Sequence, residues 1–353
     1  MIQSILNGIP FPALVISENQ TVVALNSSAI TILGDHVVGR HFVTALRQPA
    51  LLEQIEATAK DGNKRIATYV GRVAGRDTTH RVHITPADNQ LILYFEDQSE
   101  AREIGQMRRD FVANVSHELR TPLTALLGFI ETLQGPARDD PAARDRFLDI
   151  MAREAGRMTR LVDDLLTLSR VEATARIKLN KLIYISSLLE RVLAEIDPVI
   201  SANGATVRID DKSAGAKVSG DDEQLRQVLA NLIENAAKYG PQGGAIEISI
   251  TSPSYDPSLR GVGLVVSVRD QGAGIDAHHI PRLTERFYRV DTHRSRSVGG
   301  TGLGLAIVKH IVNRHRGRLR IDSALGEGTT VQVILPVSES QRDDDQSPND
   351  RPD

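Results

Sequence analysis

The chain has 353 residues, and its 42 Lys plus Arg against 45 Asp plus Glu give a formal net charge of −3. With 41% hydrophobic and 25% charged residues, the composition is that of a folded protein of roughly two to three domains, which excludes disorder over the whole length. The near balance of charge argues against nucleic-acid binding as the main activity, and the absence of cysteine excludes disulfides, thiolate metal sites and a cysteine nucleophile.

The apolar segments are too short to cross a membrane. A transmembrane helix needs about 20 consecutive apolar residues, whereas the longest apolar runs, near 182–189 and 261–268, have about eight. The uncharged residues 1–17 lack the basic leader of a signal peptide and are interrupted by Pro10 and Pro12. We therefore expect no membrane span and a cytoplasmic location.

Residues 1–97 show the pattern of a small α/β domain. The apolar runs 13–17 and 22–25 flank a polar turn, which predicts a hairpin. Further on, the segments 64–72, 78–85 and 90–96 are rich in β-branched and aromatic residues and predict three antiparallel strands. Two strands, a helical middle and three more strands resemble a PAS sensor domain, although another small α/β domain would fit the same pattern.

Residues 98–176 show a helical period in two stretches separated by a break at 135–141. In each stretch the positions at alternating spacings of three and four residues are apolar, with only Glu154 breaking the set, which is typical of an a/d seam. Two long helices with a short connection predict an antiparallel hairpin, and a second copy would complete a dimeric four-helix bundle. The seams consist of Val112, Val115, Leu119, Pro122, Leu126, Phe129 and Leu133, and of Phe147, Met151, Glu154, Met158, Leu161, Leu165 and Leu168.

Residues 177–337 alternate again between helical and strand patterns. We expect an α/β sandwich with its own core. Residues 338–353 have few apolar side chains and many charged ones, which predicts a disordered tail. Its predicted helices lie at 185–196, 223–238 and 304–316, and its strands at 206–209, 217–219, 245–251, 262–270, 318–323 and 329–335.

An exposed histidine stands out in the first long helix. With Val112 at a and Val115 at d, His117 takes position f, which points farthest from the seam. By itself an f-position histidine is usually a solvated surface residue. Here a carboxylate, Glu118, adjoins the ring, and Pro122 removes a backbone hydrogen bond at a cost of about 3 kcal/mol in a helix interior. Strain beside an exposed imidazole indicates a functional site.

The string DFVANVSHELRTPLT at 110–124 resembles the H-box of sensor histidine kinases, and the similarity continues through further boxes to about Pro336. The resemblance implies an enzyme that transfers the γ-phosphoryl group of ATP to His117 and then to an aspartate of a response regulator. It also implies that Glu118 acts as general base or orienter, and that Thr121 orients a water that removes phosphate from the regulator. A solvated surface role for Thr121 remains the alternative.

The segment 223–239 resembles the N-box of this family. Asn231, Asn235 and Lys238 are spaced i, i+4 and i+7 and so share one helix face. Asparagine is a poor helix former, and two on one face suggest a functional role, with an amide oxygen for Mg²⁺, although the pair alone could also be a buried hydrogen-bonded patch. The resemblance implies that Asn235 is the Mg²⁺ ligand and that Lys238 and Tyr239 lie near the phosphates or the sugar of ATP.

Three further segments resemble the remaining nucleotide-binding boxes. Asp270, which follows an apolar strand, is implied to accept a hydrogen bond from the adenine amine, with Gly272 and Gly274 allowing close backbone approach. Phe287 belongs to an F-box, and 291–297 reads as a lid. Glycine-rich backbone then leads into a helix whose N-terminus suits phosphate, with the nucleotide-binding residues Gly300, Thr301, Gly302, Leu303 and Gly304. The resemblance thus implies a Bergerat-type ATP-binding domain.

Two other functions are alternatives for this chain. ATPases of the same nucleotide-binding fold carry a water-activating glutamate four residues before the Mg²⁺ asparagine, and here that position is Asn231. A non-catalytic phosphotransfer scaffold would have lost nucleotide-binding residues, whereas none of the expected ones is missing. Both comparisons favour phosphotransfer to protein.

The strings at 279–291 and 300–310 look like the phosphate-regulon branch of the family. That branch commonly carries a membrane anchor before its PAS domain, and no such segment precedes the PAS-like pattern here. Either a membrane-associated partner reports phosphate status to this chain, or the PAS-like domain binds a different ligand. We expect a homodimer with a response regulator as partner, and phosphate-starvation signalling is the hypothesis for its input.

Overall fold

The computed structural model describes residues 2–73, 75–173, 179, 181–290 and 300–338. The chain divides into two compact units, 1–113 and 114–353. The predicted lid at 291–297 and almost all of the predicted tail lie outside the described residues.

The first unit is built on a five-stranded antiparallel sheet with the order β2-β1-β5-β4-β3. Its strands confirm the predicted hairpin and the three later strands. Short helices fill the middle of this segment, and a short helix that the sequence pattern did not predict precedes it. The strands are β1 (Ala13–Ile16), β2 (Val22–Leu25), β3 (Arg65–Val73), β4 (Arg76–Ala87) and β5 (Gln90–Asp97), and the helices α1 (Ile2–Asn7), α2 (Ser27–Leu33), the 3-10 helix η1 (Asp35–Val37), α3 (Phe42–Leu46) and α4 (Pro49–Asp61).

Strand β1 is buried on both faces. Leu14 and Ile16 belong to the main core beneath α2, α3 and α4, whereas Ala13 and Val15 belong to a smaller cluster with Leu6 of α1. Because successive side chains of a strand point to opposite faces, cover on both sides explains why β1 is apolar at every position. The sequence pattern of β1 is therefore a continuous run instead of an alternation.

One residue, Gln98, separates β5 from the long helix α5 (Ser99–Gln134). The Gln98 amide donates to the carbonyl of Thr79 at 2.8 Å, and the Thr79 amide donates to the Ser99 hydroxyl at 2.9 Å. The Ser99 amide in turn donates to the carboxylate of Asp97 at 2.8 Å. The start of α5 is thus hydrogen-bonded to the sheet.

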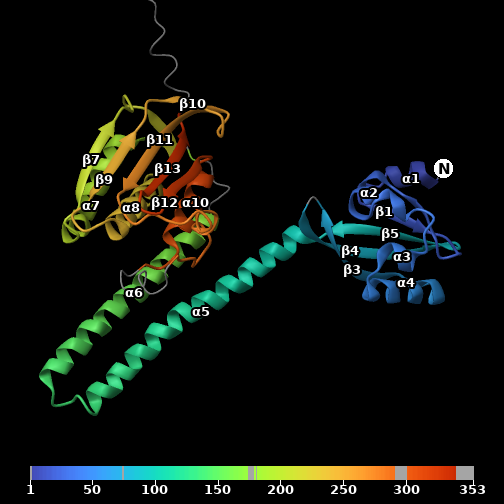
Figure 1. Cartoon of the computed structure of the whole chain (residues 1–353), viewed down its shortest axis with the longest axis horizontal. Helices are drawn as coiled ribbons and strands as arrows, with labels where there is room; N and C mark the ends of the chain where they lie inside the picture. Colours follow the sequence, from blue (N-terminus) through green and yellow to red (C-terminus); the bar gives the residue numbers. More distant parts are fainter. Residues whose placement is uncertain (1, 74, 174–178, 180, 291–299, 339–353) are drawn as a thin grey trace, which may run out of the picture. The chain divides into compact units, whose positions relative to one another are not determined.

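Helices α5 and α6 (Pro141–Ala173) form the predicted antiparallel hairpin (Figure 1). Phe129 and Phe147 stack between them with ring centroids 5.3 Å apart, and Pro122 lies inside α5 without ending it. No described helix is long and apolar enough for a membrane crossing. The N-terminal part of α5 belongs to the first unit, and the hairpin belongs to the second.

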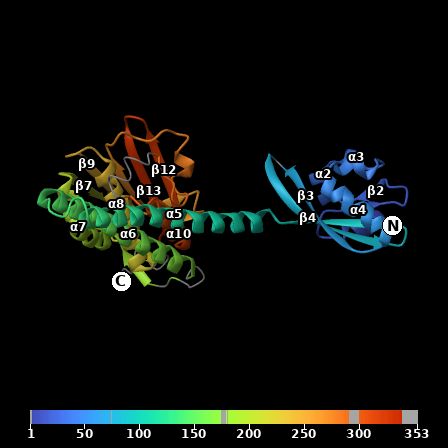
Figure 2. The same cartoon turned by 90° about the horizontal axis from the view of Figure 1, so that it is seen from below.

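The rest of the second unit is a mixed sheet covered by helices, with the order β12-β13-β11-β9-β7. Among the strands that the structure describes in this unit, only β7 and β9 pair in parallel. The elements are β7 (Thr206–Asp211), β9 (Ala245–Ile250), β11 (Gly261–Asp270), β12 (Arg318–Ala324) and β13 (Gly328–Pro336), with helices α7 (Ile185–Ala202), α8 (Asp222–Tyr239) and α10 (Gly304–Arg314). Figure 2 shows the strands and these helices as two layers, which confirms the predicted α/β sandwich.

The alternation of buried residues explains which face the helices cover. Ile246, Ile248 and Ile250 of β9 are buried, while the residues between them are less so. Helices α7, α8 and α10 bury their apolar sides over this face. The predicted strand at 217–219 is β8 (Lys217–Gly220), but it pairs with β6 (Lys181–Tyr184) in a separate two-stranded sheet. Strand β6, strand β10 (Ser254–Asp256) and the 3-10 helix η2 (Ile280–Arg282) were not predicted.

Candidate functional site: an exposed histidine and a nucleotide cavity

His117 is exposed on α5, as position f predicts. One turn later, the hydroxyl of Thr121 donates to the carbonyl of His117 at 3.2 Å. This bond occupies the only proton of the Thr121 hydroxyl. Pro122, next in the chain, is buried. The structure therefore presents the imidazole to solvent while its neighbours are held within the helix.

Glu118 is held by an arginine of the opposite helix. Arg157 of α6 donates to the carboxylate of Glu118 with a nitrogen–oxygen distance of 2.5 Å, and the Arg157 side chain is 10% exposed. A second cation, Arg289, places its guanidinium 3.8 Å from the same oxygen. The carboxylate beside His117 is thus partly buried between two arginines.

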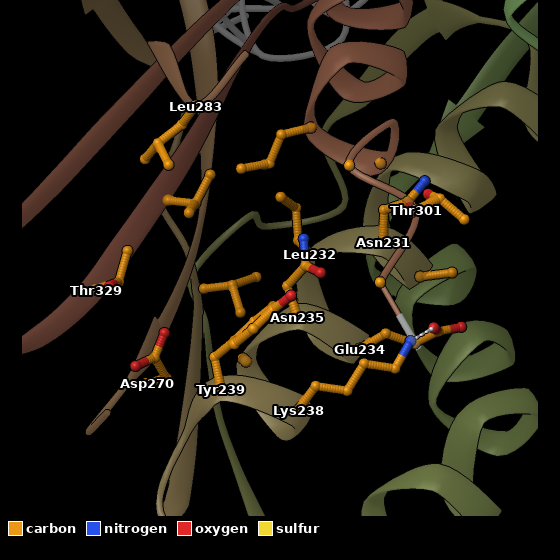
Figure 3. A pocket seen from close by; sticks show the side chains of 18 of the residues that line it. Asn231, Leu232, Glu234, Asn235, Lys238, Tyr239, Asp270, Leu283, Thr301 and Thr329 are labelled. Carbon is orange, nitrogen blue, oxygen red and sulfur yellow. Dashed lines mark hydrogen bonds and ion pairs between the residues drawn. The ribbon is translucent and has the colours of Figure 1, made fainter. Parts of the chain in front are cut away.

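A cavity of about 520 Å³ lies between α8, the end of β11 and the N-terminal end of α10 (Figure 3). Figure 3 shows Asp270 and Thr329 toward one end of it and Lys238 and Glu234 toward the other. Of the predicted nucleotide-binding residues, the structure brings together around this cavity Asn231, Asn235, Lys238, Tyr239, Asp270, Gly272, Gly274, Gly300, Thr301, Gly302 and Gly304.

Helix α8 supplies one wall of the cavity. Its first turn is capped by Asp221, whose carboxylate accepts from the Gln224 amide. Apolar residues hold one side against the sheet, so Asn231, Asn235 and Lys238 face the cavity from the other. The Lys238 ammonium pairs with Glu234 at 2.6 Å. An amide pair and a cation on one face provide oxygen donors for a cation and positive charge for an anion.

Asp270 ends the buried face of β11. Leu264, Val266 and Val268 alternate along the strand on that face, and the period of two places Asp270 with them, 9% exposed. Its carboxylate accepts from the Gly272 amide at 2.8 Å. Burial raises the pKa of the Asp270 carboxyl, whereas the backbone amides of Gly272 and Thr329 oppose this shift. An acceptor with a partly free oxygen in an apolar wall suits recognition of an amine.

The glycines of the cavity permit close contacts. A Cβ on Gly304 would lie 2.9 Å from the amide oxygen of Asn231, and Gly302 has φ +73° against the backbone of Phe287. The backbone of this segment therefore approaches both α8 and Phe287, and the amide of Phe287 donates to the carbonyl of Gly302 at 2.9 Å. The glycines bring the N-terminal end of α10 to the cavity, where backbone amides attract anions.

The structure sets several predicted residues apart from the cavity. Phe287 and Leu303 are not among its described lining residues; Leu303 is fully buried and packs in the core. His117, Glu118 and Thr121 also lie outside the lining. The group that is implied to accept phosphate is therefore separate from the pocket that would hold ATP.

Sequence reasoning missed seven charged residues of the cavity. Arg160, Asp163 and Asp164 come from α6, Glu195 from α7, Arg226 and Glu234 from α8, and Arg289 from the F-box segment. The α6 residues precede the nearest nucleotide-binding box by tens of residues, so local spacing carried no signal for them. Glu234 precedes Asn235 in the N-box segment, and its charge alone gave no signal for the cavity.

The cavity fits Mg²⁺-ATP. Its volume is within the usual range for small-molecule sites. It joins a buried acceptor at one end to a lysine and a helix N-terminus at the other. Asn235 offers a neutral oxygen of the kind Mg²⁺ accepts beside phosphate oxygens, so Asn235 is the residue that would hold the ion.

Two family models match the chain. The model of the His Kinase A (phospho-acceptor) domain matches residues 107–174. The model of histidine kinase-, DNA gyrase B- and HSP90-like ATPases matches residues 220–339. The first match contains the hairpin with His117, and the second contains the residues of the cavity.

Full-length relatives decide the family. The sensor-like histidine kinase SenX3 of Mycobacterium tuberculosis is 33% identical over 352 residues, which cover 99% of this chain and 83% of that protein. The chain belongs to the sensor histidine kinases. Phosphate regulon sensor protein PhoR of Pseudomonas aeruginosa is 42% identical over 249 residues, 70% of this sensor histidine kinase and 54% of PhoR. Sensor histidine kinase WalK of Bacillus subtilis is 35% identical over 340 residues, 93% of this chain and 54% of WalK.

The sensor histidine kinase described here thus spans about half the length of PhoR and WalK. Its fold is similar to that of histidine kinase ThkA, solved in complex with response regulator protein TrrA. The TM-score is 0.54 at 19% identity, and the match covers 96% of this chain and 99% of ThkA. This likeness supports the histidine kinase fold, with a helical phosphoacceptor region and an α/β ATPase domain.

Proposed function

We propose that this chain is a protein-histidine kinase that phosphorylates His117 with ATP and passes the phosphoryl group to an aspartate of a response regulator. The observation that carries the proposal is that the second unit contains both an exposed imidazole at an H-box position and a cavity suited to Mg²⁺-ATP. Neither element alone distinguishes this activity from ATP hydrolysis or simple binding.

The transfer conserves atoms and charge as follows. A neutral imidazole has one ring nitrogen with a free lone pair, which attacks the γ-phosphorus. The nitrogen–phosphorus bond forms, the bond to the bridging oxygen breaks, and ADP leaves. Glu118 takes up or orients the proton of the other ring nitrogen. In the second step the nitrogen–phosphorus bond breaks as a carboxylate oxygen of the regulator attacks.

Arg289 is well situated for the first step. It lines the cavity, its side chain is 7% exposed, and its guanidinium lies 3.8 Å from the carboxylate of Glu118. A cation between the nucleotide cavity and the residue beside the acceptor stabilises charge on a migrating phosphoryl group. Mg²⁺ would neutralise charge on the phosphates, and Asn235 would be its protein ligand.

Labelling from γ-³²P-ATP tests the proposal. We expect acid-labile, base-stable label on the full chain, and no label on His117→Ala. The matched control is His278→Ala, another exposed histidine, which should label like the unchanged protein. Release of free phosphate without labelled protein would contradict the kinase and favour an ATPase, and absence of ATP binding would favour a scaffold.

We also propose that the chain acts as a homodimer. Large apolar side chains remain exposed along both helices of the hairpin, and a second copy of the hairpin would cover them in a four-helix bundle. Leu127→Glu should convert the dimer to a monomer in analytical ultracentrifugation, whereas Leu325→Glu, at an exposed leucine after β12, should not. The apolar side chains are Val112, Leu123, Leu127, Ile130, Leu148, Val162 and Leu166.

The response regulator is the proposed partner, and the same site would also remove phosphate from it with Thr121 orienting water. The complex of ThkA with TrrA supports this class of partner for a protein of the same fold. Phosphotransfer profiling against every response regulator of the source genome would identify the regulator. If the labelled chain transferred phosphate to no regulator, the second step would be refuted while the first stood.

The input domain is proposed to be a PAS-like sensor, supported by its two strands, helical middle and three strands in one antiparallel sheet. Phosphate-starvation signalling from the cytoplasm is the proposed role, supported by the 42% identity to a phosphate regulon sensor protein. Unchanged phosphate-responsive transcription after loss of the kinase would contradict this role.

A further inference from the structure

A carboxylate of the phosphoacceptor hairpin reaches into the nucleotide cavity. The hydroxyl of Thr301 donates to the carboxylate of Asp164 on α6 with an oxygen–oxygen distance of 2.6 Å. The Leu303 amide donates in turn to the Thr301 oxygen at 3.3 Å. Thr301 has one hydroxyl proton, so while it serves Asp164 it cannot serve a phosphate.

The surroundings of Asp164 make this contact sensitive to charge. Asp164 lines the cavity with Asp163 and Glu234, and the cations near it are Arg160 and Lys238. Burial raises the pKa of the Asp164 carboxyl, while the Thr301 hydrogen bond opposes the shift. The ammonium of Lys238 is already paired with Glu234 at 2.6 Å. A further anion at this end of the cavity is therefore repelled by Asp164 and finds Thr301 occupied.

We propose that Asp164 is a positioning residue that competes with the phosphates of ATP for the hydroxyl of Thr301. Asp164 thereby weakens ATP binding while α6 contacts the nucleotide-binding segment. By linkage, bound ATP weakens the contact between Asp164 and Thr301 by the same factor. The inference rests on the proposed nucleotide site, and it assigns to α6 a control over the affinity of that site.

The test compares two carboxylates of α6 in the full-length chain. Asp164→Ala removes the acceptor that contacts Thr301, whereas Asp149→Ala removes an exposed carboxylate of the same helix that lies outside the cavity lining. Isothermal titration with Mg²⁺-ATP should give Asp164→Ala a Kd about five- to tenfold lower than that of the unchanged protein. Asp149→Ala should change the Kd by less than about twofold, because its carboxylate does not occupy Thr301.

A second ligand separates competition from a general loosening of the cavity. Adenosine has no phosphate, so all three proteins should bind it with equal affinity. If Asp164→Ala tightened adenosine as much as ATP, or bound ATP no better than Asp149→Ala, the competition would be refuted. If the unchanged protein bound ATP and labelled His117 while these comparisons failed, only the role of Asp164 would be lost. If it bound no ATP, the proposed function would fail as well.

Discussion

Arg157 of α6 holds Glu118 of α5 across 39 residues of sequence, with its guanidinium 2.5 Å from the carboxylate. Glu118 adjoins His117, the proposed phosphoacceptor, so the opposite helix fixes the carboxylate proposed to handle the proton of the ring. The ion pair between Arg157 and Glu118 therefore both stabilises the hairpin and positions the carboxylate beside His117.

Arg157→Met should destabilise the hairpin. The Glu118 side chain is 20% exposed, and loss of its charged partner costs about 1–3 kcal/mol of the free energy of unfolding. Urea unfolding followed by circular dichroism would measure the difference. Arg153→Met, an exposed position one turn earlier on α6, is the control. Equal stability of the two variants would show that the ion pair contributes nothing.

Glu118→Gln should slow phosphorylation of His117 without weakening ATP binding. Glutamine keeps the size of the side chain and an acceptor for Arg157 but cannot take up a proton. Loss of a general base lowers rates by about 10²–10⁴-fold, which single-turnover labelling with γ-³²P-ATP would measure. Glu131→Gln, an exposed glutamate on the same helix, should label normally. A Glu118→Gln rate within error of the unchanged rate would assign Glu118 a structural role only.

Asp270→Asn should weaken ATP binding. The buried carboxylate is the acceptor at the apolar end of the cavity, and hydrogen bonds to charged groups contribute about 1.5–3 kcal/mol, equivalent to roughly 10- to 150-fold in Kd. Titration calorimetry on Asp270→Asn and on Asp276→Asn, an exposed aspartate outside the cavity lining, would measure it. Normal ATP affinity in Asp270→Asn would place the adenine elsewhere.

His315 should make the ATP-binding region less stable in acid. It is 3% exposed; its Nδ1–H donates to the Ile311 carbonyl at 2.8 Å, and its Nε2 accepts from the Asp221 amide at 3.0 Å. Burial lowers the pKa of His315, with nearby Arg314 acting in the same direction. The unfolded chain then binds the proton more readily than the folded chain does. The contribution of neutral His315 to the free energy of unfolding is therefore fully present above pH about 6.5, and it is lost as the pH falls through the pKa of the folded protein.

Hydrogen exchange of α8, whose N-cap is Asp221, reports this effect. We compare the protection of α8, corrected for intrinsic exchange rates, in the unchanged protein and in His315→Gln. The difference in protection between the two proteins should be largest at pH 8 and should become smaller toward pH 5. His36→Gln, at an exposed histidine of the first unit, should leave α8 unaffected. A difference that stayed constant with pH would contradict the titration of His315.

Local periodicity was sufficient for the elements that carry the site. The a/d seams predicted both long helices, and position f predicted the exposure of His117, because one buried stripe fixes the orientation of a whole helix. Asp270 was placed at the cavity by the resemblance of its segment to a nucleotide-binding box, and the structure shows it on the buried face of β11. These features depend on residues that are close in sequence, so they can be predicted from the local sequence pattern.

Contacts between distant segments were not predicted. Glu118 and Arg157 both occupy g positions beside their seams, and opposite charges at such positions often pair across helices, so this signal was present but unused. The contact of Thr301 with Asp164 spans 137 residues. It depends on how the nucleotide-binding segment packs on α6, which no local pattern encodes. The pairing of β6 with β8 likewise depends on distant chain.

Gln98 is the single residue between β5 and α5, so the strand leads into the helix without a flexible loop. An α-helix turns about 100° for every residue, so adding one residue between Ser99 and His117 would point the imidazole to a different side of the rod. Adding seven would return it to within about 20° of its original azimuth. The number of residues in this stretch therefore sets the direction in which the imidazole points about the axis of α5. Natural changes in the length of this stretch should come in multiples of seven residues.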